Sequence, residues 1–386
     1  MGKIIIFCLI ALILQVSMSY TQKKSFTAIK ITQAPLMDGR LDDQCWGLGL
    51  WGGDFIQREP VSEQPATEKT EFKILYDENH IYVGIRAYDS EPDKIDKRIA
   101  RRDTWVGDII GVAFDTYYDQ RNAFEFDITA GGVKIDAIAQ DNATNWNMDW
   151  DPIWDGQVFY EDSAWTAEIK IPLSQIRFPS AAEQIWGLHV VRYIHRKQEE
   201  SDWTNIPQWS NGMAHLYGEL KGLRGLKRKK YCEFLPFFVF EHESLKADKN
   251  NPFTDGKKSS FRDGLDGKAA IHADYTLDFT IYPDFGQVEA DPASINLTSF
   301  ETFFEEKRPF FIEGKNIFDF SIDNDILFYS RRIGNKPSFI PEHDYIDYPE
   351  RTTILTAEKI SGKNDKGFSL GMIHGLTKKE EAEILY

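Results

Sequence analysis

The sequence predicts an all-β protein, and three observations support this prediction. Apolar and polar residues alternate with a period of two in several segments, as in antiparallel strands with one buried face. Aromatic residues make up 14% of the chain and include 10 Trp, a composition that favours strands. Turns rich in Gly, Asp and Asn separate the alternating segments. We therefore expect an antiparallel β-sandwich, followed by a second antiparallel β-rich region.

The clearest strands lie in the first half of the chain. Segments 72–76, 81–88, 124–129 and 165–171 each place apolar residues at every second position. The sequence Asp-Glu-Asn at 77–79 separates the first two and predicts a hairpin turn. Such alternation predicts strands with one face in the core and the other in water. One short stretch, Lys94 to Asp103, has a helical pattern.

The N-terminus predicts export. Lys3 supplies a positive charge, residues 4–14 (IIIFCLIALIL) are apolar, and Ser17 and Ser19 place small residues before a cleavage point. A membrane-spanning helix needs about 20 apolar residues, and this run is shorter. We therefore predict that residues 1–19 are a secretory signal peptide, with an N-terminal anchor as the alternative.

Charge and cysteine content narrow the classes of partner and cofactor. The formal net charge of −16 repels phosphate backbones and argues against a nucleic-acid partner. Cys45 and Cys232 remain after signal removal, too few for a disulfide framework or a zinc site, and we expect two buried thiols. The run Lys221 to Lys230 (KGLRGLKRKK) is strongly basic. We interpret its residues 223–230 as a solvated linker, rather than a membrane or nucleic-acid patch.

The linker divides the chain into residues 25–222 and 231–386. In the second region, residues 271–281 alternate strictly over about ten positions, the pattern of an outer-membrane barrel strand. About four to six strands can be formed before the chain ends, whereas a closed barrel needs about eight. We expect either an incomplete barrel that belongs to a longer protein, with a partial outer-membrane barrel at 231–386, or a soluble β-domain.

Three motifs in the first region resemble a known family. Residues 38–46 (DGRLDDQCW) resemble the opening DGxLDExxW signature of the carbohydrate-binding module family 9 fold. The hairpin at 75–83 resembles its second signature. Residues 165–172 (WTAEIKIP), followed by Trp186 and Gly187, resemble its closing one. The resemblance covers 25–222 and implies a β-sandwich that binds sugars. Trp46, Trp165 and Trp186 belong to these signatures at core-facing positions, so a structural role is expected for them.

The second region resembles an uncharacterised domain. The resemblance lies in residues 284–292 (DFGQVEADP), 300–311 (FETFFEEKRPFF) and 329–334 (YSRRIG). That domain usually follows the module in large outer-membrane-associated proteins of Gram-negative bacteria, and its members continue past this point. The resemblance implies a location in the periplasm, the outer membrane or the cell surface.

The segment 142–156 (NATNWNMDWDPIWDG) is predicted to be a sugar-binding loop. Flat aromatic faces cover the apolar side of a pyranose, and planar polar groups bind its hydroxyls. Trp105, which follows two arginines, is a second candidate platform. The alternative is that these indoles cap the core. The predicted carbohydrate-binding residues are Trp105, Trp146, Trp150, Trp154, Asn145, Asn147, Arg101 and Arg102.

The same loop offers ligands for a metal. Asp149, Asp151 and Asp155 supply hard oxygens that suit calcium. Their spacing departs from that of an EF-hand loop, because Gly156 follows the last of them. A structural calcium is therefore one hypothesis and a solvated acidic loop is the other.

Motifs of enzymes are weak in this sequence. Residues 367–371 (GFSLG) match the serine-hydrolase pattern, but Ser369 lies within strand alternation and 15 residues follow Gly371. Glu301, Glu305, Glu306 and Glu313 could supply the two carboxylates of a glycosidase, but in a chain with 61 acidic residues their closeness decides nothing. The run Glu305 to Phe311 is interpreted as a buried charge–aromatic plug or turn.

We therefore expect an envelope protein that binds a polysaccharide or glycoconjugate without catalysis of its own. The alternatives are a glycoside hydrolase or its accessory part, for which two positioned carboxylates are needed, and a structural outer-membrane protein whose sandwich does not bind sugar.

Overall fold

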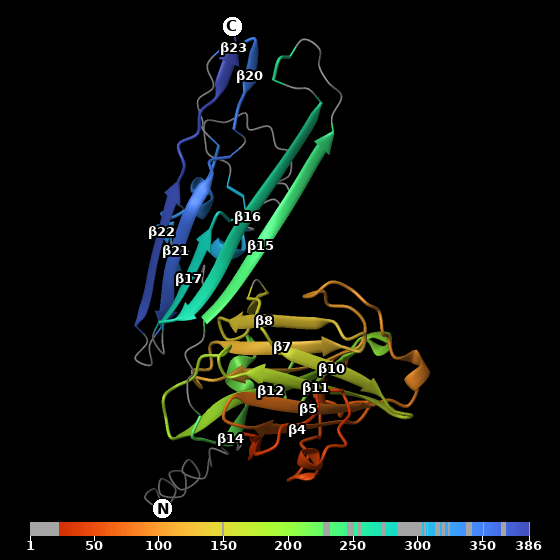
Figure 1. Cartoon of the computed structure of the whole chain (residues 1–386). Helices are drawn as coiled ribbons and strands as arrows, with labels where there is room; N and C mark the ends of the chain where they lie inside the picture. Colours follow the sequence, from red (N-terminus) through yellow and green to blue (C-terminus); the bar gives the residue numbers. More distant parts are fainter. Residues whose placement is uncertain are drawn as a thin grey trace, which may run out of the picture.

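The computed structural model describes residues 23–148, 150–226, 232–244, 251–253, 256–271, 275–283, 303–304, 306, 308–312, 317–318, 321–322, 325–336, 342–349, 351–363 and 368–385. The predicted signal peptide, residues 227–230 of the predicted linker and residues 284–292 of the second resemblance lie outside this part. The described strands confirm an all-β architecture built from mostly antiparallel sheets (Figure 1). Within the described residues no helix is long and apolar enough to cross a membrane.

The larger sheet of the N-terminal domain has nine strands in the order β1-β14-β12-β6-β7-β8-β9, with β13 beside β12 and β3 beside β13. Neighbouring strands are antiparallel except β1, which runs parallel to β14. The strands are β1 (Ser25–Thr27), β3 (Ile56–Glu59), β6 (Ile109–Asp115), β7 (Ala123–Thr129), β8 (Lys134–Gln140), β9 (Asn145–Asn147), β12 (Glu183–Ile194), β13 (Glu199–Asp202) and β14 (Gly218–Arg224).

The second sheet has five strands in the order β10-β11-β5-β4-β2. Its strands are β2 (Ile29–Lys30), β4 (Thr70–Tyr76), β5 (His80–Tyr88), β10 (Asp155–Tyr160) and β11 (Ala164–Pro172). The predicted hairpin is confirmed, because Asp77 Oδ1 accepts hydrogen bonds from the backbone N–H groups of Asn79 and His80 in the turn between β4 and β5.

The two sheets pack face to face and bury one hydrophobic core. Trp165 and Trp186 are fully buried in it, which confirms their structural role. Phe114 and Phe178 pack against Trp186 with ring centroids 5.8 and 5.7 Å away. The sandwich predicted from the alternating pattern is therefore present.

The expectation that the other face of each strand meets water is wrong for the second sheet. Glu168 and Lys73 are 0% and 1% exposed although they point away from the core. The segment before β3 covers them, with Trp46 in the 3-10 helix η1 (Gln44–Gly47). Lys73 Nζ donates to the backbone oxygens of Trp46 and Leu48, both at 2.6 Å.

Three further sequence predictions need correction. Lys94 to Asp103 is not helical beyond the single turn η2 (Pro92–Lys94), because the chain is irregular from there to β6. Cys45 and Cys232 are free, but only Cys45 is partly buried and Cys232 is exposed. The predicted linker also begins within a strand, since β14 runs to Arg224.

The second region forms a five-stranded antiparallel sheet in the order β15-β16-β17-β21-β22 (Figure 1). Ser369 lies in extended backbone within β22, so the hydrolase motif has no sharp turn at its serine. The elements of this region are β15 (Cys232–Ser244), β16 (Lys257–Ala270), β17 (Tyr275–Ile281), α2 (Pro309–Ile312), β18 (Ser321–Ile322), β19 (Asp325–Ile326), η6 (Ser330–Arg332), β20 (Tyr345–Asp347), β21 (Ile354–Lys363), β22 (Ser369–Thr377) and β23 (Glu383–Leu385).

Burial in this sheet is inverted relative to a soluble sandwich. Along β17 the polar Thr276, Asp278 and Thr280 are buried, whereas the apolar residues between them are partly exposed. On β15, Phe238 and Phe240 are 73% and 72% exposed. The apolar face is thus turned outward and the polar face inward.

Candidate functional site

The side of the nine-stranded sheet that faces away from the core carries an unusual set of polar residues. On β7, Phe126 and Ile128 point into the core, so the alternating Glu125 and Asp127 point outward. On β12 the same alternation turns His189 and Tyr193 outward, beside Glu200 and Asp202 on the neighbouring β13. We call this set the polar face: Glu125, Asp127, His189, Tyr193, Glu200 and Asp202.

Small residues on β6 make room for these side chains. Ala113 pairs with both Glu125 and His189, and Gly111 pairs with both Asp127 and Val191. A Cβ atom on Gly111 would lie 1.5 Å from Asp127 Oδ1. The glycine is therefore required for the carboxyl group to lie flat over β6.

Glu125 and Trp146 form the accessible part of this face. The indole Nε1 of Trp146 donates to Glu125 Oε2 at 2.5 Å, and the Trp146 side chain is 39% exposed. Glu125 is half-buried and hydrogen-bonded to Asp127. Burial, followed by the charge of Glu200, raises the pKa of Glu125 to about 7, and burial beside Glu125 raises the pKa of Asp127 further above its ordinary value.

A second group of polar contacts lies beneath the segment that joins β13 to β14. Arg58 Nη1 is 2.9 Å from Glu200 Oε1, and His189 Nε2 is 3.5 Å from Asp202 Oδ1. The ring of Tyr217 stacks on His189 at 4.8 Å and 6°. Burial lowers the pKa of His189 to about 3, so the imidazole is neutral at ordinary pH. Burial raises the pKa of Asp202, and neither of its oxygens has a hydrogen-bond partner within the described residues.

Aromatic side chains line the edge of the polar face. Trp105 is 48% exposed and its ring lies 6.1 Å from that of Tyr193. Tyr193 pairs in register with Glu200, which pairs in turn with Glu59. Gln208 Nε2 donates to Glu59 Oε1 at 3.3 Å. This hydrogen bond brings Trp209, which follows Gln208 in the chain and is 80% exposed, to the same edge.

That residue, Trp209, was not predicted from the sequence. It lies in the turn-forming stretch 206–212 (IPQWSNG), outside the family signatures. The sequence does contain a sign of its exposure, because this indole lies in a stretch rich in Pro, Ser, Asn and Gly. Such loops run over the surface and offer little apolar surface that could bury an indole. Trp209 joins Trp105 and Trp146 as a candidate platform.

The structure separates the predicted sugar-binding residues into two groups. Trp150 and Trp154 are 7% and 4% exposed and pack against Phe126 at 5.5 and 5.6 Å. The prediction that they bind sugar is therefore corrected, because their faces are covered by the core. Arg102 is also held there, with Nη2 bound to Asp136 Oδ1 at 2.6 Å and to the backbone oxygen of Pro152 at 2.8 Å.

The remaining predicted residues lie near the surface. Asn145 is exposed and Asn147 half-buried on β9, and they flank Trp146 on the opposite side of the strand. Arg101 is exposed in the loop that leads to Trp105. Of the original set, Trp105 and Trp146 present open aromatic faces on the edge and floor of the polar face.

The calcium hypothesis gains no support from the loop. Asp149 lies outside the described residues, and Asp151 pairs with Arg102 at 2.8 Å. Asp155 is exposed at the start of β10, in register with Lys170. Within the part of the chain that the structure describes, no three His, Cys, Asp or Glu residues are arranged to hold a metal ion. Calcium stays a prediction.

Of the four acidic residues that could supply glycosidase carboxylates, only Glu306 lies within the described part of the chain, and it forms an ion pair with Arg308. Arg308 Nη2 lies 2.7 Å from Glu306 Oε2, and the guanidinium lies over the ring of Phe311 at 4.2 Å. This arrangement is the charge–aromatic plug expected from the sequence. Glu301, Glu305 and Glu313 lie outside the described residues.

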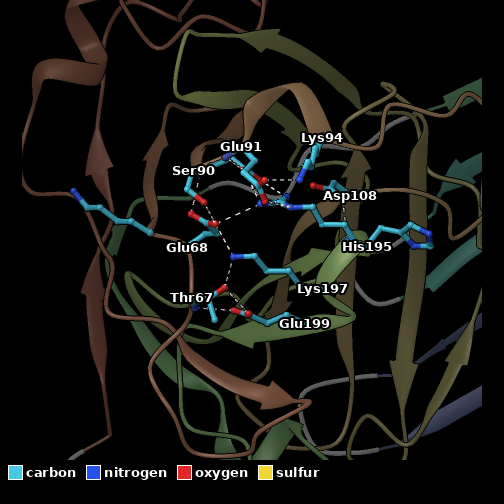
Figure 2. A network of polar contacts seen from close by, with 12 residues as sticks. Thr67, Glu68, Ser90, Glu91, Lys94, Asp108, His195, Lys197 and Glu199 are labelled. Carbon is cyan, nitrogen blue, oxygen red and sulfur yellow. Dashed lines mark hydrogen bonds and ion pairs between the residues drawn. The ribbon is translucent and has the colours of Figure 1, made fainter.

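A separate charge network fixes one end of the sandwich (Figure 2). Lys197 Nζ bridges Glu68 Oε1 at 2.6 Å and Thr67 Oγ1 at 2.7 Å, as Figure 2 shows. Arg196 binds both oxygens of Asp89 at 2.7 Å, and the buried Arg192 lies 3.6 Å from the same carboxylate. Since these charges are paired with one another, we interpret the network as a structural clamp between β5 and the turn after β12.

Comparisons with known proteins match each region of the chain. Residues 37–221 match the family model described as "Carbohydrate family 9 binding domain-like", and residues 232–385 match "Domain of unknown function (DUF5916)". A search of curated proteins found no match.

Among solved structures, the chain is similar to a carbohydrate-binding module of family 9 from Caldicellulosiruptor kristjanssonii in complex with glucose. The two sequences are 16% identical, the match covers 53% of this chain and 97% of that chain, and the TM-score is 0.39. The same module in complex with cellotriose gives 16% identity, coverage of 53% and 95%, and a TM-score of 0.37. A protein of Bacteroides uniformis ATCC 8492, whose suggested role is carbohydrate binding, gives 10% identity, coverage of 52% and 99%, and a TM-score of 0.42.

Proposed function

From the premise that residues 37–221 form a carbohydrate family 9 binding domain-like domain, followed by a DUF5916 domain, we propose that the chain is an exported protein that binds a polysaccharide or glycoconjugate on its polar face. One observation carries the location of the site. The exposed indole of Trp146 is fixed by its hydrogen bond to Glu125, so a flat apolar surface and a carboxylate adjoin on one open face.

This arrangement suits the chemistry of a sugar. A pyranose presents an apolar face of C–H groups and a rim of hydroxyls. Trp146 and Trp105 offer aromatic faces, and the half-buried Glu125 and Glu200 offer oxygens that accept hydrogen bonds from hydroxyls. Arg58 is positioned by Glu200 and can donate to a sugar oxygen.

The proposal of an envelope location rests on two supports. Residues 1–19 have the composition of a secretory signal peptide. The inverted burial of the five-stranded sheet, with Phe238 and Phe240 exposed and Asp278 buried, is the polarity of a surface adapted to an apolar environment. Detection of the mature chain in isolated outer membranes, rather than in the soluble fraction, would test the location.

Sugar binding is tested by titrating the mature chain with a panel of soluble oligosaccharides in a calorimeter. We expect Trp146→Ala and Trp105→Ala each to weaken binding by about tenfold, because an aromatic contact contributes about 0.5–1.5 kcal/mol beyond the apolar area it buries, and about 1.4 kcal/mol is a factor of ten in affinity. Phe238→Ala is the control, since it removes an aromatic ring that is more exposed than either indole but lies on β15, in the sheet of the second region. Absence of binding to every glycan, or unchanged binding by both Trp variants, would overturn the proposal.

A further inference from the structure

The segment that joins β13 to β14 lies over the outward side of the nine-stranded sheet. We call residues 206–217 the cover segment. A hydrophobic cluster joins it to outward-facing alanines of the sheet and to the turn after β8, and consists of Ile206, Met213, Ala214, Tyr217, Ala113, Ala123, Ala139 and Ala143. Ala139 pairs in register with Trp146, so the two side chains share one face of the sheet. The cover segment therefore reaches the strand pair that carries Trp146.

Trp209 is exposed, yet the cover segment is anchored on both sides of it. The Trp209 side chain is 80% exposed. On one side, Gln208 Nε2 donates to Glu59 Oε1 on β3 at 3.3 Å. On the other, the backbone oxygen of Asn211 accepts a hydrogen bond at 2.9 Å from Nδ2 of Asn142, in the turn between β8 and β9. Since the backbone is held on either side, this indole loses little conformational freedom on contact with a ligand.

Asn142 joins the cover segment to the turn before β9. Its Oδ1 accepts the backbone N–H of His215 at 3.0 Å, and its backbone oxygen accepts that of Met213 at 2.7 Å. Asp141, Asn142 and Ala143 all have left-handed φ angles, of +53°, +65° and +54°. Consecutive left-handed residues with a Cβ atom are unfavourable on their own, so the contacts with the cover segment maintain this turn.

Trp146 and Trp209 are anchored at different positions across the polar face. The Trp146 indole is bound to Glu125 on β7, whereas Gln208, next to Trp209, is bound to Glu59 on β3. In sheet order β6, β12 and β13 lie between β7 and β3, which gives four strand spacings of about 4.8 Å each. A separation of this size is wider than one sugar ring and suits separate rings of one chain.

We infer that Trp146 and Trp209 bind different sugar rings of one extended glycan chain that runs across the strands, and that Asn142 is the positioning residue that fixes their spacing. The inference rests on the proposed sugar-binding function and names the class of ligand, a linear oligosaccharide or polysaccharide rather than a mono- or disaccharide. Linear β-1,4-linked chains fit this arrangement, because their successive rings present apolar faces along an extended ribbon.

Two length series of oligosaccharides test the inference by calorimetric titration of the mature chain. They are the β-1,4-linked oligomers of glucose and those of xylose, each from dimer to hexamer. Affinity should rise by about tenfold from dimer to hexamer, once the chain reaches the second indole. Trp209→Ala should remove this gain and leave the affinity for the dimer within about twofold, whereas Trp146→Ala should weaken binding at every length.

Asn142→Gly tests the positioning role, because glycine keeps the left-handed backbone and its oxygen but lacks Oδ1 and Nδ2. It should lower the affinity for the hexamer by about threefold to tenfold and spare the dimer, since Trp209 is present but less firmly held. Gly212→Ala displaces the segment by another route, because its Cβ atom would lie 2.2 Å from Asn142 Nδ2. Asn335→Gly, at an exposed position of the second region, is the matched control. Urea denaturation shows whether each variant is folded.

The same affinity for dimer and hexamer, or a hexamer affinity that Trp209→Ala leaves unchanged, would overturn the inference and leave the proposed function intact. Equal weakening of dimer and hexamer by Asn142→Gly would show a merely structural role and overturn the positioning assignment. Failure of both series while another glycan of the broader panel binds would also overturn the inference. Failure of the whole panel would remove the proposed function itself.

Discussion

The indole Nε1 of Trp46 donates a hydrogen bond to Glu168 Oε1 at 2.8 Å, although the two residues are 122 positions apart in the chain. The other oxygen of Glu168 accepts the backbone N–H groups of Asp38 and Gly39, both at 2.9 Å. Two of the sequence signatures, at 38–46 and 165–172, are thus the two halves of one buried polar contact. In this structure, Trp46, Asp38, Gly39 and Glu168 of these signatures are therefore engaged in a contact within the fold.

Removal of the Glu168 carboxylate should destabilise the protein. Glu168→Ala leaves three buried N–H donors without their acceptor, and one unsatisfied buried group costs about 1–3 kcal/mol. We expect a loss of about 3 kcal/mol in the free energy of unfolding of the N-terminal domain, measured by urea denaturation with tryptophan fluorescence. The control is Glu183→Ala, which removes an exposed carboxylate paired with Arg224. Equal effects of the two substitutions would contradict this role for Glu168.

Gly39 has a backbone conformation that other residues avoid. Its φ is +85°, and a Cβ atom would lie 2.6 Å from the backbone carbon of Val158. Gly39→Ala should therefore destabilise the domain by about 2 kcal/mol or more, through both backbone strain and the clash. Gly47→Ala is the matched control, because no atom lies within 4 Å of a Cβ placed there. If both variants unfold at the same urea concentration, the argument from the Gly39 conformation fails.

The Trp-rich loop contains a pair of residues with opposite expected effects. Trp150 packs against Phe124 at 5.1 Å and is nearly buried, whereas Trp146 is 39% exposed. Trp150→Ala should lower the free energy of unfolding by about 3–5 kcal/mol, as for other buried aromatic residues. Trp146→Ala should cost much less and should affect glycan binding. A loss of stability in Trp146→Ala as large as that in Trp150→Ala would show that Trp146 is a core residue.

This pair also shows what the sequence could and could not predict. Alternation identified the strands and placed Trp165 in the core, because the period of two determines which residues share a face of a strand. It did not show what covers each face. Glu168 is buried beneath a segment more than 100 positions earlier in the chain, and this tertiary contact leaves no periodic signal around Glu168 itself. The roles of Trp150 and Trp209 were missed for the same reason, since irregular loops have no period.

The candidate site was predicted in part. Trp105 and Trp146 are predicted from the sequence because aromatic residues in polar loops are typical of sugar sites, and the structure shows that both are exposed. The carboxyl groups of the polar face were read as the water-facing side of ordinary strands. Only the structure shows that Asp127 and Asp202, on strands separated by β6 and β12, share one partly covered surface.

Several buried carboxyl groups make stability depend on pH. Burial is the largest cause that raises the pKa of Asp115 and Asp136 to about 6, and of Glu125 and Glu168 to about 7. Each group binds its proton more tightly in the folded state than in the unfolded chain, where the pKa is about 4. Between about pH 4 and pH 7 the folded state therefore holds more protons, and the free energy of unfolding falls as pH rises.

We accordingly expect the urea midpoint of the N-terminal domain to be higher at about pH 5 than at about pH 7.5, as the linkage relation requires for raised carboxyl pKa values. Below about pH 4 the direction reverses, because Glu68 and Asp77 have lowered pKa values despite their burial, owing to the hydrogen bonds they accept. Glu125→Gln removes one titrating group and should narrow the difference between pH 5 and pH 7.5, whereas Glu78→Gln, in the exposed turn between β4 and β5, should leave it unchanged. A midpoint that rises steadily from pH 5 to pH 7.5 in the unmodified chain would mean that these carboxyl groups are ionised in the folded protein, and that the polar face is not desolvated as its burial indicates.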